Sequence, residues 1–150
     1  MNIIDAGPSR GMGVGIGDDL TPSHSIPGWN RGGHTVGFHA DNGLKYFRMG
    51  HGQPYRDSCF KDGDTIGCGY DVASRSVFFT KNGQFLGVAF SEIPHFKFYP
   101  MVGSLEKCKV CFNFGKKPFM FDFDYFYVAQ GDTLREQAKE VRAGLYKWKI

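Results

Sequence analysis

The stretch T-I-G-C-G-Y-D-V-A-S-R-S-V-F-F-T-K-N-G-Q-F-L-G-V-A-F, from Thr65 to Phe90, decides the fold of this chain. Near its middle, Asn82-Gly83 separates two apolar runs. Both residue types accept the positive φ angles of a two-residue type I′ turn, whose twist matches that of the strands it joins. The sequence therefore predicts a β-hairpin that turns at Asn82-Gly83.

The turn also predicts the register of the hairpin. It pairs Lys81 with Gln84, Phe79 with Leu86, and Val77 with Val88. Because successive side chains of a strand point to opposite faces, the last two pairs share one face, which is wholly apolar. The other face is mixed. One core face and one mixed face are typical of an antiparallel β-sandwich.

A turn at 62–64 and a strand over 65–70 precede the hairpin. The order G-D-x-I-G-C-x-Y, V-F-F-T-K-N-G and L-G-x-A-F resembles the core of a SPRY domain. That family forms a β-sandwich that recognises protein partners through its loops. The resemblance implies the same fold and the same kind of function for this chain.

Four further motifs extend the resemblance to the Ran-binding protein M type of SPRY domain. They are I-P-G-W (26–29), V-G-F-H-A-D-N-G (36–43), G-Q-P-Y (52–55) and F-G-K-K-P-F-M-F-D (114–122). Their colinear order covers the chain from about Ile3 to Asp122.

Length and composition agree with a single all-β domain. The chain has 150 residues, is rich in Phe and has 21 Gly, which suits many short strands with Gly-rich turns. We predict an antiparallel, SPRY-like β-sandwich over residues 1–122 with an aromatic linker and a C-terminal amphipathic α-helix over 123–150. The helix follows from a capping box at 133–136 and an apolar stripe after it. The sequence leaves open whether this helix docks on the sandwich or on a partner.

Charge and cysteine usage narrow the function classes. A net charge of +3 is too small to indicate a nucleic-acid binder, and no apolar run is long enough to span a membrane. Four cysteines in a chain of this size do not suggest a disulfide scaffold. We expect free thiols and a cytoplasmic protein, with the nucleus as a second location.

Two glycine-containing segments near the N-terminus need interpretation. G-M-G-V-G-I-G (11–17) does not fit the dinucleotide-binding spacing, and its strict alternation predicts a core strand instead. The segment before it holds only a short strand, Asn2-Ile3-Ile4, where SPRY domains have a full one. We expect this to leave a sheet edge uncovered, through which the chain self-associates unless the C-terminal helix covers the gap.

The sequence shows no pattern that indicates catalysis, a cofactor or a metal. Cys108 and Cys111 lie three apart on a predicted strand, so their thiols point to opposite faces and cannot bind one ion. We expect a protein that is not an enzyme. The alternative is a small-molecule-binding or hydrolytic sandwich that uses a His/Cys cluster in the 18–60 loops, such as Cys59 with His39 or His51.

The resemblance implies that loops at one end of the sandwich form a shallow pocket for a short peptide or a partner surface. Carried over by position, the candidate partner-binding residues are Asp18, Tyr46, Val102, Gly103 and Ser104. Tyr46 is the expected aromatic anchor; the alternative is that Tyr46 is a packed strand residue and Gly103 a turn glycine. The Ran-binding protein M type further implies an adaptor related to ubiquitin-ligase assemblies.

Overall fold

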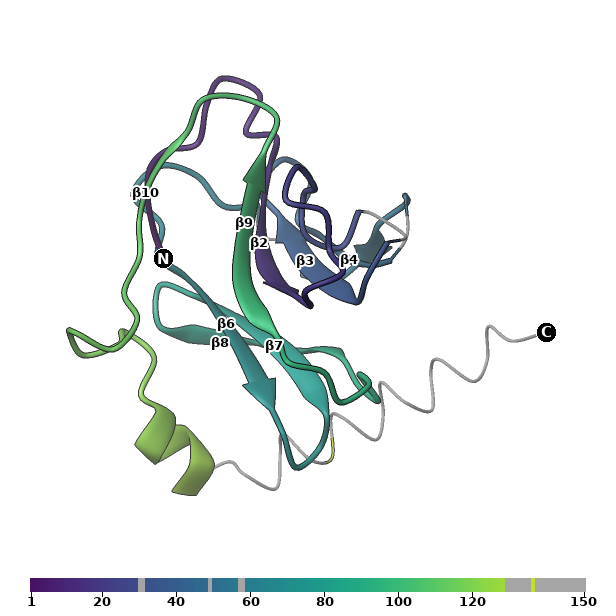
Figure 1. Ribbon diagram of the computed structural model, residues 1–150. Helices are drawn as coiled ribbons and strands as arrows, with labels where there is room; N and C mark the ends of the chain where they lie inside the picture. The colour runs from purple at the N-terminus through teal and green to yellow at the C-terminus, as the bar shows by residue number, and fades with distance from the viewer. Residues whose placement is uncertain (30–31, 49, 57–58, 129–135, 137–150) are drawn as a thin grey trace.

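The computed structural model describes residues 1–29, 32–48, 50–56, 59–128 and 136 of the chain. In these ranges the chain forms mostly antiparallel strands, and residues 123–128 are helical. The strands are β1 (Asn2–Asp5), β2 (Met12–Gly17), β3 (Thr35–His39), β4 (Leu44–Phe47), β5 (Gln53–Pro54), β6 (Ile66–Asp71), β7 (Ser76–Lys81), β8 (Gln84–Phe90), β9 (Tyr99–Ser104) and β10 (Lys109–Cys111). The predicted all-β, antiparallel class is confirmed (Figure 1).

One layer of the sandwich is a five-stranded sheet in the order β5-β4-β3-β2-β9. As predicted, β2 points Met12, Val14 and Ile16 into the core, and its glycines face the other way. Figure 1 shows β9, β2, β3 and β4 side by side in this layer.

The second layer contains the three-stranded sheet β6-β7-β8 and the two-stranded ribbon β1-β10. The two are joined, because the Ile3 amide donates to the Asp64 carbonyl (2.9 Å) and the Ile66 amide donates to the Met1 carbonyl (2.8 Å). The short first strand is therefore bonded on both sides rather than left uncovered. Self-association through a sheet edge stays a prediction.

The central hairpin turns where the sequence predicts. Asn82 and Gly83 have φ angles of 51° and 79°, and Lys81 pairs with Gln84. The predicted register continues through Thr80 and Phe85 and is wrong beyond that pair. Val77 pairs with Phe90 instead of Val88, because the β7–β8 ladder contains two irregularities.

These irregularities move Val88 to the opposite face of the sheet, where it packs with Phe78. Gly87, with φ 98°, supplies the backbone conformation that the extra residue requires. The hydroxyl of Tyr55 fills the gap in the ladder: it accepts from the Phe79 amide (3.3 Å) and donates to the Gly87 carbonyl. Burial raises the pKa of Tyr55 and so keeps this bridging hydroxyl protonated.

The structure has two apolar clusters, of which one holds the layers together. The main core lies between the sheets; its largest fully buried side chains include Phe38, Phe60, Phe79 and Phe90. The second lies on the outer face of β6-β7-β8 and consists of Phe78, Val88, Phe121 and Phe126, with Phe85 packed against it. The second cluster attaches residues 121–126 to the sandwich.

Other strand and helix boundaries in the structure differ from those that the sequence predicts. β9 continues through Ser104, so Gly103 and Ser104 are strand residues rather than loop residues. β10 begins at Lys109, so it contains Cys111 but not Cys108, which was predicted on the same strand. The predicted amphipathic helix falls outside the described residues except at Glu136, and the division at Asp122 stays a prediction. Within the described residues, no helix has the length and apolar character to cross a membrane.

Candidate functional site

A loop covers the outer face of the five-stranded sheet, and glycines make room for it. A Cβ atom on Gly37 would lie 1.9 Å from the Pro27 carbonyl oxygen, and one on Gly103 would lie 2.6 Å from the Ser25 carbonyl oxygen. Since real Cβ contacts are never this short, residues 25–28 rest directly on the backbone of β3 and β9. This close approach is the reason for the glycines on that face.

His39 and Tyr46 form one wall of the covered region. Their rings stack with centroids 3.9 Å apart, and Tyr46 is only 6% exposed. The His39 Nε2 atom lies 2.8 Å from the Pro27 carbonyl, which only accepts, so Nε2 carries a proton. Burial lowers the pKa of His39. The Tyr46 hydroxyl accepts from the Asn42 amide (3.0 Å). Tyr46 is thus packed under the loop that covers the sheet.

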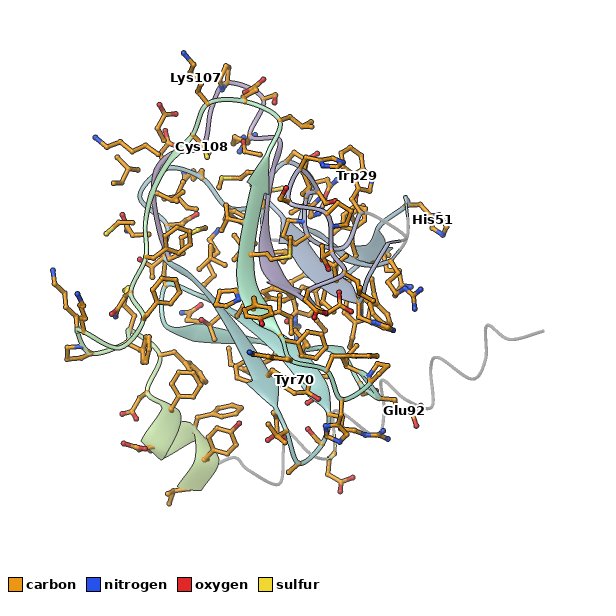
Figure 2. The ribbon with its side chains drawn as sticks, viewed as in Figure 1. Trp29, His51, Tyr70, Glu92, Lys107 and Cys108 are labelled. Atoms are coloured by element: carbon orange, nitrogen blue, oxygen red, sulfur yellow. The ribbon has the colours of Figure 1, made fainter. Side chains whose placement is uncertain are left out.

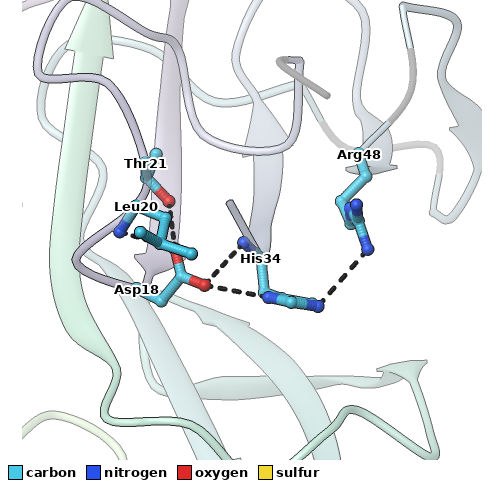
Figure 3. Close-up of polar contacts among 5 residues, drawn as sticks. All are labelled: Asp18, Leu20, Thr21, His34 and Arg48. Carbon is cyan, nitrogen blue, oxygen red and sulfur yellow. Dashed lines mark hydrogen bonds and ion pairs between the residues drawn. The ribbon is translucent and has the colours of Figure 1, made fainter. Parts of the chain in front are cut away.

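Asp18 lies where β2 ends and organises the loops at that end of the sandwich (Figure 3). Its carboxylate accepts from the Thr21 hydroxyl (3.0 Å), from the Leu20 amide (3.2 Å) and from the His34 amide (2.9 Å). Burial by itself would raise the pKa of Asp18, but the hydrogen bonds from His34, Thr21 and Leu20 outweigh it and hold the pKa below its ordinary value.

A second contact from Asp18 fixes the ring of His34. Nδ1 of His34 lies 2.9 Å from the Asp18 carboxylate, and Nε2 lies 3.3 Å from the Arg48 guanidinium. The carboxylate only accepts and the guanidinium only donates, so the ring is neutral with its proton on Nδ1. Phe96 stacks on the same ring, with centroids 3.9 Å apart. The ring is therefore held from three directions.

The result is a surface at this end, which we call the loop-end surface: His34, Arg48 and Phe96. Phe96 is 43% exposed. Trp29, which is also 43% exposed, lies at the other end of β3, where its ring meets His39 edge-on at 6.0 Å and its indole donates to the Gly50 carbonyl (3.0 Å). Figure 2 shows Trp29 and His51 on the β3–β4 side of the molecule, well away from Cys108. The sequence predictions did not include His34, Arg48 or Phe96. The pairing of β2 with β3 could have identified His34: Gly17 pairs with Thr35, which places Asp18 opposite His34.

The structure does not bring the five sequence-predicted residues together. Asp18 belongs to the loop end, whereas Ser104 pairs with Met12 at the opposite end of β2. Val102 packs against the main core, and Gly103 lies beneath the loop at Ser25. Their roles in partner binding stay predictions.

The Ser104 hydroxyl accepts a hydrogen bond from the Glu106 amide (3.3 Å), which holds the turn after β9. Tyr46, as described above, is buried near the middle of the sheet.

Two side chains named for the alternative His/Cys chemistry have other partners in the described part of the chain. The Cys59 thiol donates to the Asp41 carbonyl (3.6 Å), and His39 is bonded to Pro27. Among the residues that the structure describes, no hydrogen bond joins Cys59 to a histidine, and no group of three or more His, Cys, Asp or Glu forms a metal site. The four cysteines are free thiols.

Comparison with known proteins agrees with this architecture. The SPRY domain family model matches residues 3–117. Ran-binding protein 9 of Xenopus laevis is 34% identical over 151 residues, which cover 100% of this chain and 26% of the relative. Ran-binding protein M homolog of Arabidopsis thaliana is 33% identical over 120 residues, which cover 80% of this chain and 25% of the relative. The chain thus spans about a quarter of the length of these relatives.

A solved structure supports the same assignment. The crystal structure of a human SPRY domain superposes with a TM-score of 0.55 at 29% identity, over 69% of this chain and 68% of that chain. SPRY domains are generally protein–protein interaction modules and are typically not enzymes. With a family match over most of its length, relatives of the Ran-binding protein M type and a shared fold, the chain belongs to the SPRY domain family.

Proposed function

We propose that this domain binds a short peptide or a partner surface through the loops at one end of the sandwich, without catalysis. The surface that does so is the loop-end surface at His34, Arg48 and Phe96. Loops positioned by a rigid sheet are common binding sites, because the scaffold holds their side chains at little entropic cost.

The observation that carries the proposal is the network that holds Phe96. Asp18 fixes His34, Arg48 bonds to the far nitrogen of the same ring, and Phe96 stacks on it. Phe96 nevertheless keeps 43% of its surface exposed. A rigid, half-exposed aromatic side chain beside a cation is typical of an interface hot spot.

The charges at this end favour an acidic partner. Arg48, His95 and Lys97 are exposed on these loops, and the Lys97 amine lies 5.4 Å from the centre of the Tyr99 ring. The Arg48 guanidinium bonds His34 through one nitrogen, so its other N–H groups can donate to a carboxylate. We therefore expect the bound segment to carry an acidic residue next to an apolar one.

The resemblance to the Ran-binding protein M type extends the proposal to an adaptor in ubiquitin-ligase assemblies, located in the cytoplasm and also in the nucleus. Co-purification of ubiquitin-ligase subunits with the tagged chain, together with imaging of that chain in cells, tests this extension. Absence of such subunits from the captured proteins would contradict the adaptor role but would not contradict the proposed binding surface.

The test of the binding surface uses a partner captured from lysate and then purified. We expect Phe96→Ala and Arg48→Ala each to weaken its affinity by about 2 kcal/mol, or about thirtyfold, with an unchanged melting temperature. Tyr125→Ala is the matched control, since Tyr125 is 66% exposed and does not belong to the loop-end surface. Unchanged affinity in both loop-end variants would contradict the proposal.

A further inference from the structure

The loop-end surface has at its centre a histidine between two charged residues (Figure 3). Nδ1 of His34 lies 2.9 Å from the Asp18 carboxylate, and the two side chains are 19% and 1% exposed. Nε2 lies 3.3 Å from the guanidinium of Arg48, which is exposed. The contact between His34 and Arg48 is therefore the part of this network that lies at the surface.

The guanidinium of Arg48 has a neutral partner where arginine prefers a charged one. In the described part of the chain, no carboxylate pairs with Arg48, which donates to the neutral Nε2 atom of His34 instead. A bond from a guanidinium to a carboxylate is shorter and stronger than a bond to a neutral acceptor. A carboxylate that a partner brings to this place therefore competes well for the Arg48 donors.

The arrival of such a carboxylate changes the best protonation state of His34. Once Arg48 donates to the carboxylate, the Nε2 atom of neutral His34 has lost its donor and faces a group that only accepts. Uptake of one proton from solvent turns Nε2 into a donor. His34 and Arg48 then both donate to the bound carboxylate, and the new positive charge of the ring lies between that carboxylate and Asp18.

Asp18 is suited to hold this positive charge. Burial by itself would raise its pKa, but the hydrogen bonds from His34, Thr21 and Leu20 outweigh burial and hold the pKa below its ordinary value. The carboxylate of Asp18 therefore stays ionised throughout the pH range in which histidines change charge.

The cationic groups around the ring oppose the same charge while no ligand is bound. Arg48 stays protonated and contacts Nε2 directly. The third element packed against the ring is the loop between β8 and β9, whose Phe96 stacks on His34. On either side of Phe96 this loop exposes His95 and Lys97, and it also carries Glu92 nearer to β8. An anion at this place offsets the repulsion between the ring and its cationic neighbours.

We propose that the loop-end surface binds an aspartate or glutamate side chain of the partner between Nε2 of His34 and the Arg48 guanidinium, and that His34 takes up a proton as it binds. This inference rests on the proposed function, because it names the group that the same surface recognises and how pH regulates it. Since binding consumes a proton, the affinity for the partner rises as the pH falls toward the range in which histidines titrate.

The probe is a synthetic peptide in which an aspartate stands next to a leucine, with two glycines on either side. It is titrated into the isotope-labelled full chain and followed by NMR at about pH 7.5 and about pH 5.5. We expect binding at least about fivefold tighter at the lower pH. At the higher pH, the ring signals of His34 should move toward those of an imidazolium as the peptide binds. The same peptide with asparagine in place of aspartate should show neither effect.

Two histidine variants identify the group that takes up the proton. His34→Gln cannot titrate, so its affinity for the peptide should be the same at both pH values. His95→Gln is the matched control, because it removes the exposed histidine on the neighbouring loop and should keep the full pH dependence. The ring signals of His34 in the parent chain give the same answer without any substitution.

Four results would overturn the inference: equal affinity at both pH values, a His34 ring that stays neutral when the peptide is bound, a pH dependence lost in His95→Gln but kept in His34→Gln, or no binding at either pH. Binding that does not depend on pH but is weakened by Phe96→Ala and by Arg48→Ala would overturn only the proton uptake and would support the loop-end surface. Failure of this inference is therefore distinguishable from failure of the proposed function.

Discussion

At the scale of single residues, Tyr46 is a position where a binding role and a packing role predict different results. The sequence makes it the aromatic anchor of a pocket, but its ring is 6% exposed and stacks on His39 beneath residues 25–28. A side chain in this position packs against the covering loop.

We expect Tyr46→Ala to destabilise the fold by about 3–5 kcal/mol, because it removes a buried aromatic ring. Tyr46→Phe keeps the stack on His39 and loses only the hydrogen bond from Asn42, so its loss should be about 0.5–1.5 kcal/mol. Chemical denaturation of both variants measures the difference. Weaker partner affinity in Tyr46→Ala at an unchanged free energy of unfolding would instead support the anchor role.

Asp18 makes stability depend on pH. Its folded pKa lies below the ordinary value of 3.8, so its contribution is fully present above that value and is lost as pH falls through the folded pKa. We expect Asp18→Asn to flatten the fall of melting temperature between about pH 5 and pH 2. Asp19→Asn, at the exposed neighbour, is the control and should follow the parent curve. Parallel curves for all three proteins would show that Asp18 does not titrate differently on folding.

At the scale of elements, the β7–β8 hairpin combines a local and a tertiary determinant. The turn conformation depends on Asn82 and Gly83, since both φ angles are positive there. The bulge beyond it depends on Tyr55, which lies far away in sequence and satisfies the amide and carbonyl that the bulge leaves unpaired.

Replacing both Asn82 and Gly83 with Ala should destabilise the fold by about 1–2 kcal/mol per residue, because Ala resists positive φ. A Cβ on residue 83 would also approach the Met120 carbonyl to 2.8 Å. Asn82→Gly keeps the turn but loses the bonds from Asn82 to Asp64 (2.8 Å) and from the Thr65 amide (2.7 Å). Thermal unfolding of both variants distinguishes the stability lost through the positive φ angles from the stability lost with these hydrogen bonds. A double Ala variant as stable as the parent would contradict the prediction.

At the scale of the whole molecule, a loop held against a sheet closes the outer face. Pro27 lies against Gly37, and His39 bonds to the Pro27 carbonyl. The same loop leads to Trp29, so packing against the glycines also positions that indole beside His39.

Gly37→Ala should lower stability by about 1–3 kcal/mol, because the added methyl group displaces residues 25–28 from the sheet. For a chain of this length, that corresponds to a fall in melting temperature of about 2–12 °C. Gly50→Ala is the matched control, since nothing lies within 4 Å of its added Cβ. Equal melting temperatures for the two variants would show that the loop is not held by this contact.

The sequence predicts the class of fold, most strands and the turn, but no member of the loop-end surface; it identifies only Asp18, which holds His34 in place. Asp18 is recognisable as a polar residue at the end of an alternating strand. His34 and Phe96 come from segments some sixty residues apart, and no local pattern indicates that their rings stack. The sequence offers a turn for Gly103 because glycine is common in turns. In the structure, the loop at Ser25 packs directly against the Gly103 backbone, which leaves no room for a side chain.

The sequence by itself determined the features that short-range physics specifies: the turn at Asn82-Gly83 and the alternation of core residues and glycines in β2. Turn dihedrals and side-chain alternation depend on neighbouring residues, so the residues alone are enough. Tertiary structure alone decided the register beyond the turn, the pairing of β1 with both β10 and Asp64, and the burial of Tyr46. Each depends on a contact between segments distant along the chain, which exists only when the whole core is packed.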